Sequence, residues 1–195
     1  MAAMLELNRT ALKEWAAIQR SLARGQILLI RKGGILEQKH GFTVEHREFF
    51  LFPTYAHQNE NDLVPAAHGD LAASFQASAP PDQVWFDFYA AAEEVWKVDH
   101  LDSLRHLEGQ HVLSWPAVEA RFHYRRPGVH VLALRLFQLA ETIRHANHKR
   151  YDGCVSWVEL EEALPTASAR PVLSGEDFRA KLEAVRGALA SAVPI

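Results

Sequence analysis

The sequence of 195 residues has a single cysteine, Cys154, and it lacks any apolar run as long as a membrane-spanning helix requires. One cysteine cannot form an internal disulfide, which favours a reducing compartment. The first residues, MAAMLELNRTALKEW, carry charges where a signal peptide needs an apolar stretch, so export is not expected. These absences predict a soluble cytoplasmic protein with no membrane association.

Motifs for common metals and cofactors are missing too. The chain contains neither an HExxH string nor a glycine-rich phosphate loop. A restriction-type nuclease site needs an acid before a string such as Glu37-Gln38-Lys39, but no aspartate occurs before Asp62. His145 and His148 would share one face of a helix, yet no third ligand follows at a recognisable spacing. The sequence therefore predicts no metal and no organic cofactor.

What the sequence contains is typical of a folded globular protein. Hydrophobic residues make up 48%, charged residues 23% and aromatic residues 10%, which provides enough apolar surface for a core. Intrinsic disorder is therefore excluded. The length suits one domain, which we expect to span residues 1–195.

A repeating apolar pattern near the N-terminus predicts a helix over approximately residues 8–24. The apolar side chains recur at steps of three and four residues: Leu12, Trp15, Ile18 and Leu22. Polar residues, among them Glu14, take the opposite side, and Gly25 is well placed to end the helix.

Three further segments complete the N-terminal half. Residues 26–31 are a short apolar run that predicts a buried strand. The aromatic stretch 42–52 predicts another strand, which Pro53 would end because proline has no amide hydrogen to donate. Residues 56–81 are rich in Asn, Ala, Pro and Ser, so we expect a long surface loop with at most one helical turn.

The C-terminal half is expected to alternate between strands and short helices. The expected strands are 83–98, where a helix is the competing interpretation, 129–139 and 156–160. The expected helices are 101–107, 114–124 and a C-terminal one over 174–193. Ser114 and Ser174 are suited to cap the last two, the second through a capping box with Asp177. This order predicts an α+β fold with a mixed or antiparallel sheet packed with an N-terminal and a C-terminal helix.

Four short strings occur together in a recognisable order: Ala11–Trp15 (ALKEW), Arg31–Ile35 (RKGGI), Phe52–Gln58 (FPTYAHQ) and Gly153–Trp157 (GCVSW). With them the chain resembles the bacterial and archaeal family of domains of unknown function numbered 1802, over residues 7–164. The family has no assigned activity. Some relatives are said to occur beside restriction-endonuclease-like domains, so the resemblance implies a link to restriction, defence or nucleic-acid processing.

A looser resemblance concerns the fold. A helix, a glycine and an apolar strand that lead into a small sheet are similar to domains of the PUA and ASCH type. This resemblance implies a small barrel as one form of the expected sheet. Domains of that type often bind RNA or modified bases, which is an analogy at the level of the fold.

Basic residues concentrate in one segment. Residues 121–150 hold seven Lys and Arg against one acid, a net charge of +6, so the other residues sum to −9. Aromatic side chains are interleaved, as phosphate neutralisation with base stacking requires. The residues expected to contact phosphates are Arg121, Tyr124, Arg125 and Arg126. The alternative is a solvated face that pairs with the acidic stretches 82–108 and 151–183.

Polar groups are densest around the FPTYAHQ string. The side chains expected to line a groove are Arg31, Lys32, His46, Tyr55, His57 and Gln58. A carboxylate next to an imidazole can tune a general base, so Glu45, His46 and His57 are the candidate catalytic residues if the protein is an enzyme. The alternative is that the histidines only cap strand ends.

Three functions from different classes follow. The first is a domain that binds nucleic acid or a nucleotide. The second is a hydrolase or nuclease that uses Glu45, His46 and His57. The third is a protein–protein interaction module that uses residues 56–81 or the final amphipathic helix. Cys154 is either a nucleophile paired with a histidine or a small core side chain.

Overall fold

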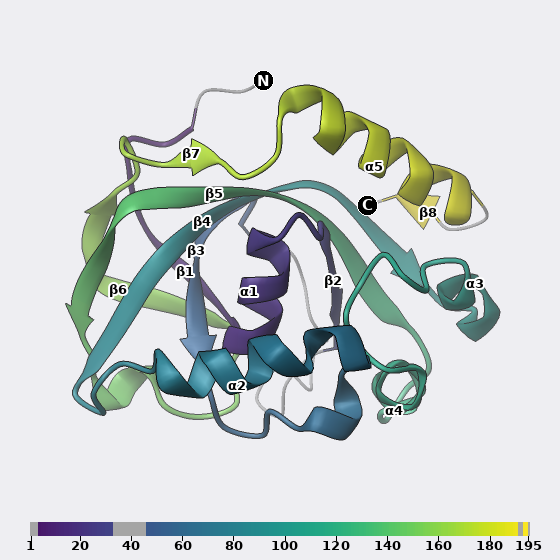
Figure 1. The fold of residues 1–195 in the computed structure, drawn as a ribbon, viewed down its shortest axis with the longest axis horizontal. Helices are drawn as coiled ribbons and strands as arrows, with labels where there is room; N and C mark the ends of the chain where they lie inside the picture. Colours follow the sequence, from purple (N-terminus) through teal and green to yellow (C-terminus); the bar gives the residue numbers. More distant parts are fainter. Residues whose placement is uncertain (1–3, 33–45, 191–192, 195) are drawn as a thin grey trace.

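The computed structural model describes residues 4–32, 46–190 and 193–194. Its main feature is a curled mixed sheet whose concave side holds helix α1 (Ala16–Ala23) (Figure 1). In sheet order the strands are β2 (Leu28–Arg31), β5 (Val129–Ala146), β4 (Gln83–Val98), β3 (Glu48–Thr54), β1 (Leu7–Trp15) and β6 (Trp157–Pro165). Strands β1 and β3 run parallel, and the other neighbours run antiparallel. The expected α+β class with a mixed sheet is confirmed.

The curvature comes from the two longest strands. The pairing of β4 with β5 shifts register between Phe86 and Phe88 and again between Ala92 and Glu94. Such bulges bend a strand and increase its twist, which lets the sheet wrap around a helix. The pairings in the described part of the chain leave β2 and β6 as separate edges, so the sheet is not closed into a barrel.

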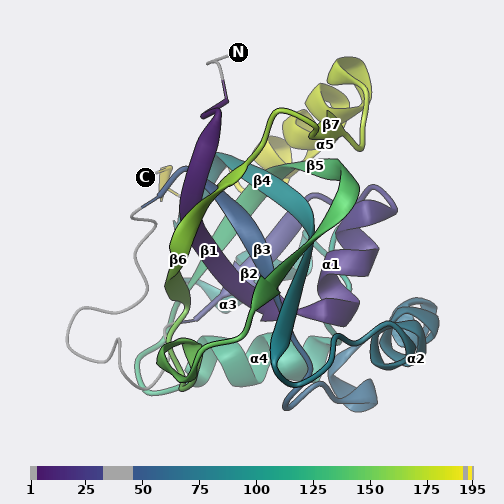
Figure 2. The same cartoon turned by 90° about the vertical axis from the view of Figure 1, so that its left-hand side faces the viewer.

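Three of the other helices lie at the two ends of the sheet (Figure 2). Helices α2 (His68–Gln76) and α4 (Trp115–His123) lie at one end, and α5 (Gly175–Ala188) lies at the other, next to the short strand β7 (Arg170–Pro171). Helix α3 (Leu101–Arg105) follows β4, and β8 (Val193–Pro194) pairs with β4. No helix in the described ranges has the length and apolar character that crossing a membrane requires.

The expected N-terminal helix is wrong over its first half. Residues 7–15 form β1, whose backbone pairs with β3 on one side and β6 on the other. Ala11 and Leu12 are both fully buried and belong to different cores on the two faces of the sheet. Ile18 and Leu22 do form the buried face of α1, and Gly25 follows its end with a φ of 96°.

Pro53 does not end its strand. The pairing of β3 with β4 reaches only Phe50, whereas β3 continues beside β1 with Pro53 opposite Glu14 and Thr54 opposite Trp15. Proline is tolerated at this position because its missing amide hydrogen falls beyond the pairing with β4. The two parallel strands therefore end side by side. The expected start of this strand, residues 42–45, lies outside the described residues.

The stretch 56–81 contains more helix than expected. It holds two 3-10 turns, Glu60–Asp62 and Pro65–Ala67, and then the nine-residue helix α2. The helix is fixed by a buried carboxylate, because Asp70 accepts a hydrogen bond from Ser21 Oγ at 2.6 Å and pairs with Arg24. Ser21 lies on α1 and Arg24 directly follows that helix, both far from Asp70 in the sequence, so local composition does not reveal them.

The two capped helices of the C-terminal half form as expected. Ser114 Oγ accepts the Ala117 N–H at the start of α4, and Ser174 Oγ accepts the Asp177 N–H at the start of α5. Helix α5 ends at Ala188, five residues before the expected boundary at 193. Strands β4 and β5 cover the expected ranges, and β5 extends farther, to Ala146.

The second core, on the face of the sheet opposite α1, is rich in aromatic rings. The Phe50 ring meets Phe86 at 5.6 Å and Tyr89 at 4.9 Å between centroids, both edge to face. Each such pair contributes roughly 0.5–1.5 kcal/mol beyond its buried area. This packing fixes β3 against β4 and so holds the end of β3 in place.

Candidate functional site

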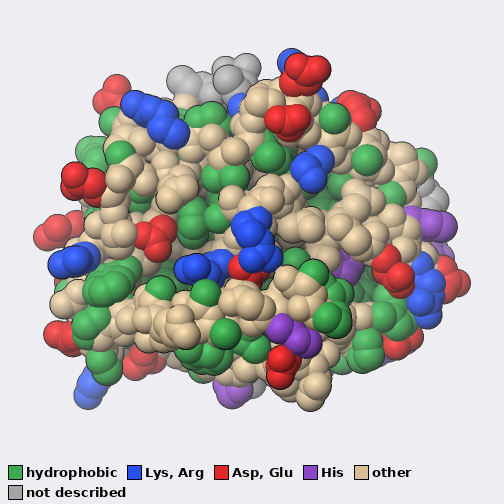
Figure 3. Space-filling view, in the orientation of Figure 1, with side chains coloured by type: hydrophobic (Ala, Val, Ile, Leu, Met, Phe, Trp, Pro, Cys, Tyr) green, Lys and Arg blue, Asp and Glu red, His purple; other side chains and the backbone are tan. Residues whose placement is uncertain are grey.

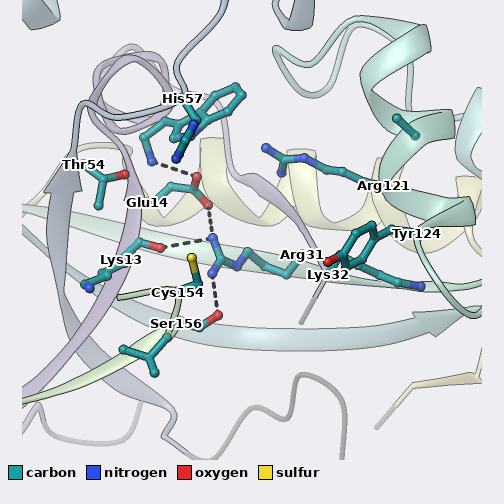
Figure 4. A pocket seen from close by; sticks show the side chains of 13 residues that line it. Lys13, Glu14, Arg31, Lys32, Thr54, His57, Arg121, Tyr124, Cys154 and Ser156 are labelled. Carbon is teal, nitrogen blue, oxygen red and sulfur yellow. Dashed lines mark hydrogen bonds and ion pairs between the residues drawn. The ribbon is translucent and has the colours of Figure 1, made fainter. Parts of the chain in front are cut away.

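A cavity of about 530 Å³ opens where the ends of β1 and β3 meet β2, α4 and the segment before β6. We call it the first cavity. Parallel strands bring their carboxyl ends to the same edge of a sheet, which explains why residues of β1 and β3 share it. Its lining side chains with polar groups are Lys13, Glu14, Arg31, Lys32, Thr54, His57, Arg121, Tyr124, Cys154 and Ser156 (Figure 4).

All four strings that carry the family resemblance meet at this cavity. Residues 13–15 come from ALKEW, 31 and 32 from RKGGI, 54 and 57 from FPTYAHQ, and 154–156 from GCVSW. The strings lie far apart in the sequence, and the β1–β3 and β1–β6 pairings bring three of them together. The first cavity is therefore the best candidate for a functional site.

A buried ion pair lies at the centre of the first cavity. Arg31 Nη1 lies 2.9 Å from Glu14 Oε2, and their side chains are only 12% and 2% exposed. Arg31 also donates to the Lys13 carbonyl at 3.1 Å and to Ser156 Oγ at 2.9 Å, while Glu14 Oε1 accepts the Trp15 N–H at 2.8 Å. Figure 4 shows Arg31 bridging these groups. The charge of Glu14 is thus balanced, and both side chains are held in one orientation.

Lys13 holds the segment before β6 against the cavity. Its ammonium donates to the Gly153 carbonyl at 3.0 Å and to the Tyr151 carbonyl. Burial lowers the pKa of Lys13 below its ordinary value, although Asp152 and Cys154 act in the opposite direction. Cys154 is exposed and lines the cavity, so the interpretation of this thiol as a core side chain is wrong.

Lys32 closes the opposite wall. Its ammonium donates to the Phe122 carbonyl at 3.3 Å and to the carbonyls of Arg126 and Gly128, which follow α4. A lysine at this position satisfies carbonyl groups that a helix end leaves open. Burial lowers the pKa of Lys32, and Asp99 opposes the shift. Figure 4 shows its side chain running away from the guanidinium of Arg31, so Lys32 mainly fixes α4 to β2.

Arg121 brings a cation with unfilled donors to the cavity. Its Nη1 donates to the Ile30 carbonyl at 2.7 Å, which is its hydrogen-bond partner among the described residues, and its guanidinium lies 5.2 Å from the Trp15 ring centroid. Burial lowers the pKa of Arg121; Glu14 opposes the shift and the neighbouring Arg31 adds to it. An arginine stays protonated under these conditions. A partly buried cation beside a second cation is a favourable place for an anion.

Two exposed rings complete the rim. His57 has a φ of 63°, a region that few residues other than glycine adopt, and its ring points toward the cavity (Figure 4). Tyr124 is 41% exposed, and the Arg125 guanidinium lies 5.1 Å from the centroid of its ring. Strained backbone and exposed aromatic rings both occur preferentially at binding sites.

Several residues expected to share the groove lie elsewhere. His46 packs its ring edge to face against Trp157, 5.3 Å between centroids, and does not line the first cavity. Glu45 lies outside the described residues. Gln58 accepts the Ala17 N–H at 2.8 Å and donates to Ser74 Oγ at 3.2 Å, so it joins α1 to α2.

Tyr55 lines a different cavity, of about 460 Å³, which we call the second cavity. Burial raises the pKa of its hydroxyl, although the Ala79 backbone opposes the shift. Successive residues of an extended chain point to opposite sides, so Thr54, the last residue of β3, faces the first cavity, and Tyr55, which follows it, faces the second. Figure 3 shows this face of the molecule, where basic and acidic side chains lie together above α2.

The basic segment 121–150 does not form one continuous surface. Arg121 and Tyr124 line the first cavity, whereas Arg125 and Arg126 lie outside its lining. Farther along, Arg135 is buried against the rings of Phe137 and Phe178, and Arg144 and Arg150 stack on Trp85 and Tyr151. The segment disperses because β5 is long and points its side chains alternately to both faces of the sheet.

Sequence reasoning misses Glu14, Lys13 and Ser156. It puts Glu14 on the surface of a helix and gives the other two no role in a site. The strings ALKEW and GCVSW contain all three, so the family resemblance is the signal that could have found them. Within the described ranges, no group of three or more His, Cys, Asp or Glu side chains is arranged to hold a metal ion.

Comparisons with known proteins place the chain in a family. No curated protein matches it. A crystal structure of a mutant of ZmASCH from Zymomonas mobilis is similar, with 10% sequence identity and a TM-score of 0.41, over 92% of this chain and 98% of that chain. The family model that describes a domain of unknown function, DUF1802, matches residues 11–184. The chain therefore belongs to the DUF1802 family.

Proposed function

We propose that the first cavity binds a nucleotide, either free or as one residue of a nucleic-acid strand. Its volume of about 530 Å³ lies in the range typical of small-molecule sites, roughly 300–1,000 Å³. A nucleotide combines an anionic phosphate with a flat aromatic base. The cavity offers a partner for each of these two parts.

The phosphate would be bound by Arg121. The lining carries four Lys and Arg side chains and one carboxylate, Glu14, whose charge Arg31 already balances. The remaining cations give the cavity a positive potential, which attracts anions. One observation carries the proposal: the Arg121 guanidinium is partly buried and keeps unfilled hydrogen-bond donors within the described part of the chain. His57 is placed at the rim to assist.

The base would stack on the aromatic wall. Trp15 lines the cavity under the Arg121 guanidinium, and Tyr124 is exposed at its edge. Stacking of a base on an aromatic side chain contributes roughly 1–3 kcal/mol and tolerates any base. An adjacent guanidinium adds to such a stack. Phosphate contact and stacking together support a nucleotide over a simple inorganic anion.

The other functions gain less support from the placement of the residues. A hydrolase that uses His46 and His57 would need both at one site, and only His57 lines the first cavity. An interaction module that used α5 would need its apolar side, which packs against the core through Phe178, Leu182 and Val185. In α2 the Phe75 side chain is 49% exposed, and no described feature indicates what would cover it. The link to restriction, defence or nucleic-acid processing stays a prediction of the family resemblance.

The test compares two arginines. Calorimetric titration with nucleoside monophosphates and with a short single-stranded oligonucleotide measures affinity for wild type, Arg121→Met and Arg20→Met. Arg20 lines the second cavity and is exposed, so its replacement is the matched control. A hydrogen bond to a charged group contributes about 1.5–3 kcal/mol, so Arg121→Met should weaken binding about 10- to 100-fold. Arg20→Met should leave the affinity unchanged.

A second readout uses the thiol in the cavity wall. Cys154 is the sole cysteine and is exposed, so a thiol reagent labels one defined position. A bound nucleotide should slow this labelling in wild type and should not slow it in Arg121→Met. Absence of binding and of protection at millimolar nucleotide, in low salt, would overturn the proposal.

A further inference from the structure

The buried carboxylate of the first cavity keeps two acceptor positions open. A carboxylate offers about four lone-pair sites on its two oxygens. The Trp15 N–H occupies one site on Oε1 of Glu14, and Arg31 Nη1 occupies one on Oε2. Among the described residues no other donor reaches this carboxylate. Each oxygen thus keeps one lone pair, and Glu14 lines the cavity between His57 and Arg31 (Figure 4).

The complementary group is a pair of neighbouring N–H donors. Guanine presents such a pair, N1–H and N2–H, on its Watson–Crick edge. Adenine and cytosine present one amino group beside a ring nitrogen that is itself an acceptor, which would face the second oxygen unfavourably. Uracil presents one N–H between two carbonyls, which are also acceptors. Of the four bases, guanine alone satisfies both oxygens of a fixed carboxylate.

Arg121 and Glu14 would contact different parts of the nucleotide. Arg121 keeps unfilled donors for the phosphate, and its guanidinium points into the cavity (Figure 4). The open acceptor positions of Glu14 are left for the base. We infer that the first cavity selects guanine, with Glu14 binding N1–H and N2–H. This inference rests on the proposed nucleotide binding and adds base selectivity to it.

The ion pair with Arg31 explains why Glu14 suits this role. Arg31 and the Trp15 N–H each bind one carboxylate oxygen, so the carboxylate of Glu14 is held in one orientation. The side chain is only 2% exposed, so a base that leaves the oxygens unpaired also strips them of water. Sites that hydrogen-bond a substrate group reject analogues that lack it by large factors, because buried polar groups are then left unpaired.

The experiment compares nucleotides that differ at single positions. Titration of wild type with GMP, IMP, AMP, CMP and UMP measures the selectivity directly. IMP keeps N1–H, O6 and N7 and lacks only the N2 amino group, so it isolates one of the two contacts to Glu14. We expect GMP to bind at least about tenfold more tightly than IMP and more tightly than the other three, in line with one lost hydrogen bond to a charged group.

Two variants assign the selectivity to the carboxylate. Glu14→Gln replaces one acceptor oxygen by a donor and should reduce the ratio of IMP to GMP dissociation constants to about one. Asp70→Asn changes a buried carboxylate of the second cavity and should keep the wild-type ratio. The ratio is taken within each variant, so a general change in stability or affinity cancels.

The outcomes separate the two claims. Equal binding of all the nucleotides, or a preference for another base, would overturn guanine selectivity and leave nucleotide binding in place. A GMP preference that survives in Glu14→Gln would overturn the role of the carboxylate. If Glu14→Gln does not fold, the GMP to IMP comparison in wild type still decides the selectivity. Binding of none of the nucleotides would overturn the proposed function itself.

Discussion

The two cavities differ in how their charged groups are paired. They have similar volumes, about 530 and 460 Å³, and the end of β3 separates them, with Thr54 in one and Tyr55 in the other. In the second cavity Arg24 pairs with Asp70, which also accepts a hydrogen bond from Ser21. Asp87 accepts a hydrogen bond from Thr142 Oγ1 at 2.6 Å. Its two carboxylates face two arginines, so its charges balance.

The first cavity has an excess of positive charge instead, and its free donors are sheltered from water. Arg20 of the second cavity also has unfilled donors among the described residues, but it is exposed, so water satisfies them. Arg121 is partly buried, and unfilled donors cost more free energy there than on an exposed side chain. Volume alone therefore does not identify a site. Open hydrogen-bonding positions on sheltered groups are the better indicator.

The largest expected effect is on the unfolding free energy, and it compares the buried carboxylates of the two cavities, Glu14 and Asp70. Glu14→Ala leaves Arg31 buried without its carboxylate, which costs about 3–5 kcal/mol of unfolding free energy. Asp70→Ala should cost less, about 1–3 kcal/mol, because its partner Arg24 is 56% exposed and can turn to water. Urea denaturation of both variants gives the two values. An equal or greater loss in Asp70→Ala would contradict the difference we draw between the cavities.

A second test measures how stability depends on pH through His111, which lies near Arg121 of the first cavity. His111 is buried, and burial together with the nearby Arg121 lowers its pKa to about 4. As the pH falls below about 6.5, His111 becomes protonated in the unfolded chain but stays neutral in the folded protein until about pH 4. The unfolding free energy should therefore decrease between about pH 6.5 and 4. The expected loss is up to about 3 kcal/mol, from about 1.4 kcal/mol for each pKa unit.

Two variants identify the group behind this slope. His111→Asn keeps an acceptor for the Leu113 N–H, which donates to Nδ1 at 3.2 Å, and removes the titrating ring. It should flatten the slope, measured by urea denaturation across that pH range. His106→Asn changes an exposed histidine and should keep the slope. A wild-type stability that stays constant from pH 7 to 4 would show that His111 is not held neutral.

Elements with local signals are the ones that sequence reasoning places well. Ser114 and Ser174 cap their helices through neighbours three residues away, and the apolar run of β2 marks a buried strand. The helix predicted over the residues of β1 is wrong because a local signal misleads there. Its Leu12 and Trp15 continue the three- and four-residue spacing of Ile18 and Leu22, although a strand and a helix meet between them.

The candidate site can be predicted only in part, because its geometry depends on distant pairings. Arg31, His57, Arg121 and Tyr124 are expected to bind the ligand, and they do line one cavity. Glu14 joins them through the pairing of β1 with β3 in parallel, which no local pattern indicates. The binding roles of these residues stay predictions that the titrations above test.

A third test concerns Gln58, which is expected from the sequence to face the ligand and instead joins α1 to α2. Gln58→Ala removes the acceptor for the Ala17 N–H in the first turn of α1, which should cost about 1 kcal/mol of unfolding free energy. Nucleotide affinity should not change. Gln76→Ala, at an exposed position of α2, is the control for both measurements. If Gln58→Ala lowered nucleotide affinity and left stability unchanged, Gln58 would have to contact the ligand.

The smallest expected effect separates strain from binding at two residues with the same backbone angle. His57 and Arg125 both have a φ of 63°, yet only His57 lines the first cavity. Glycine adopts this region without a steric penalty, so His57→Gly and Arg125→Gly should each raise the unfolding free energy by about 0.5–1 kcal/mol. Only His57→Gly should weaken nucleotide binding, by a few-fold. Stabilisation in both variants with a binding loss in one would show that His57 is kept in a strained conformation for the ligand. If His57→Gly bound the nucleotide as tightly as wild type, His57 would serve only the turn and not the ligand.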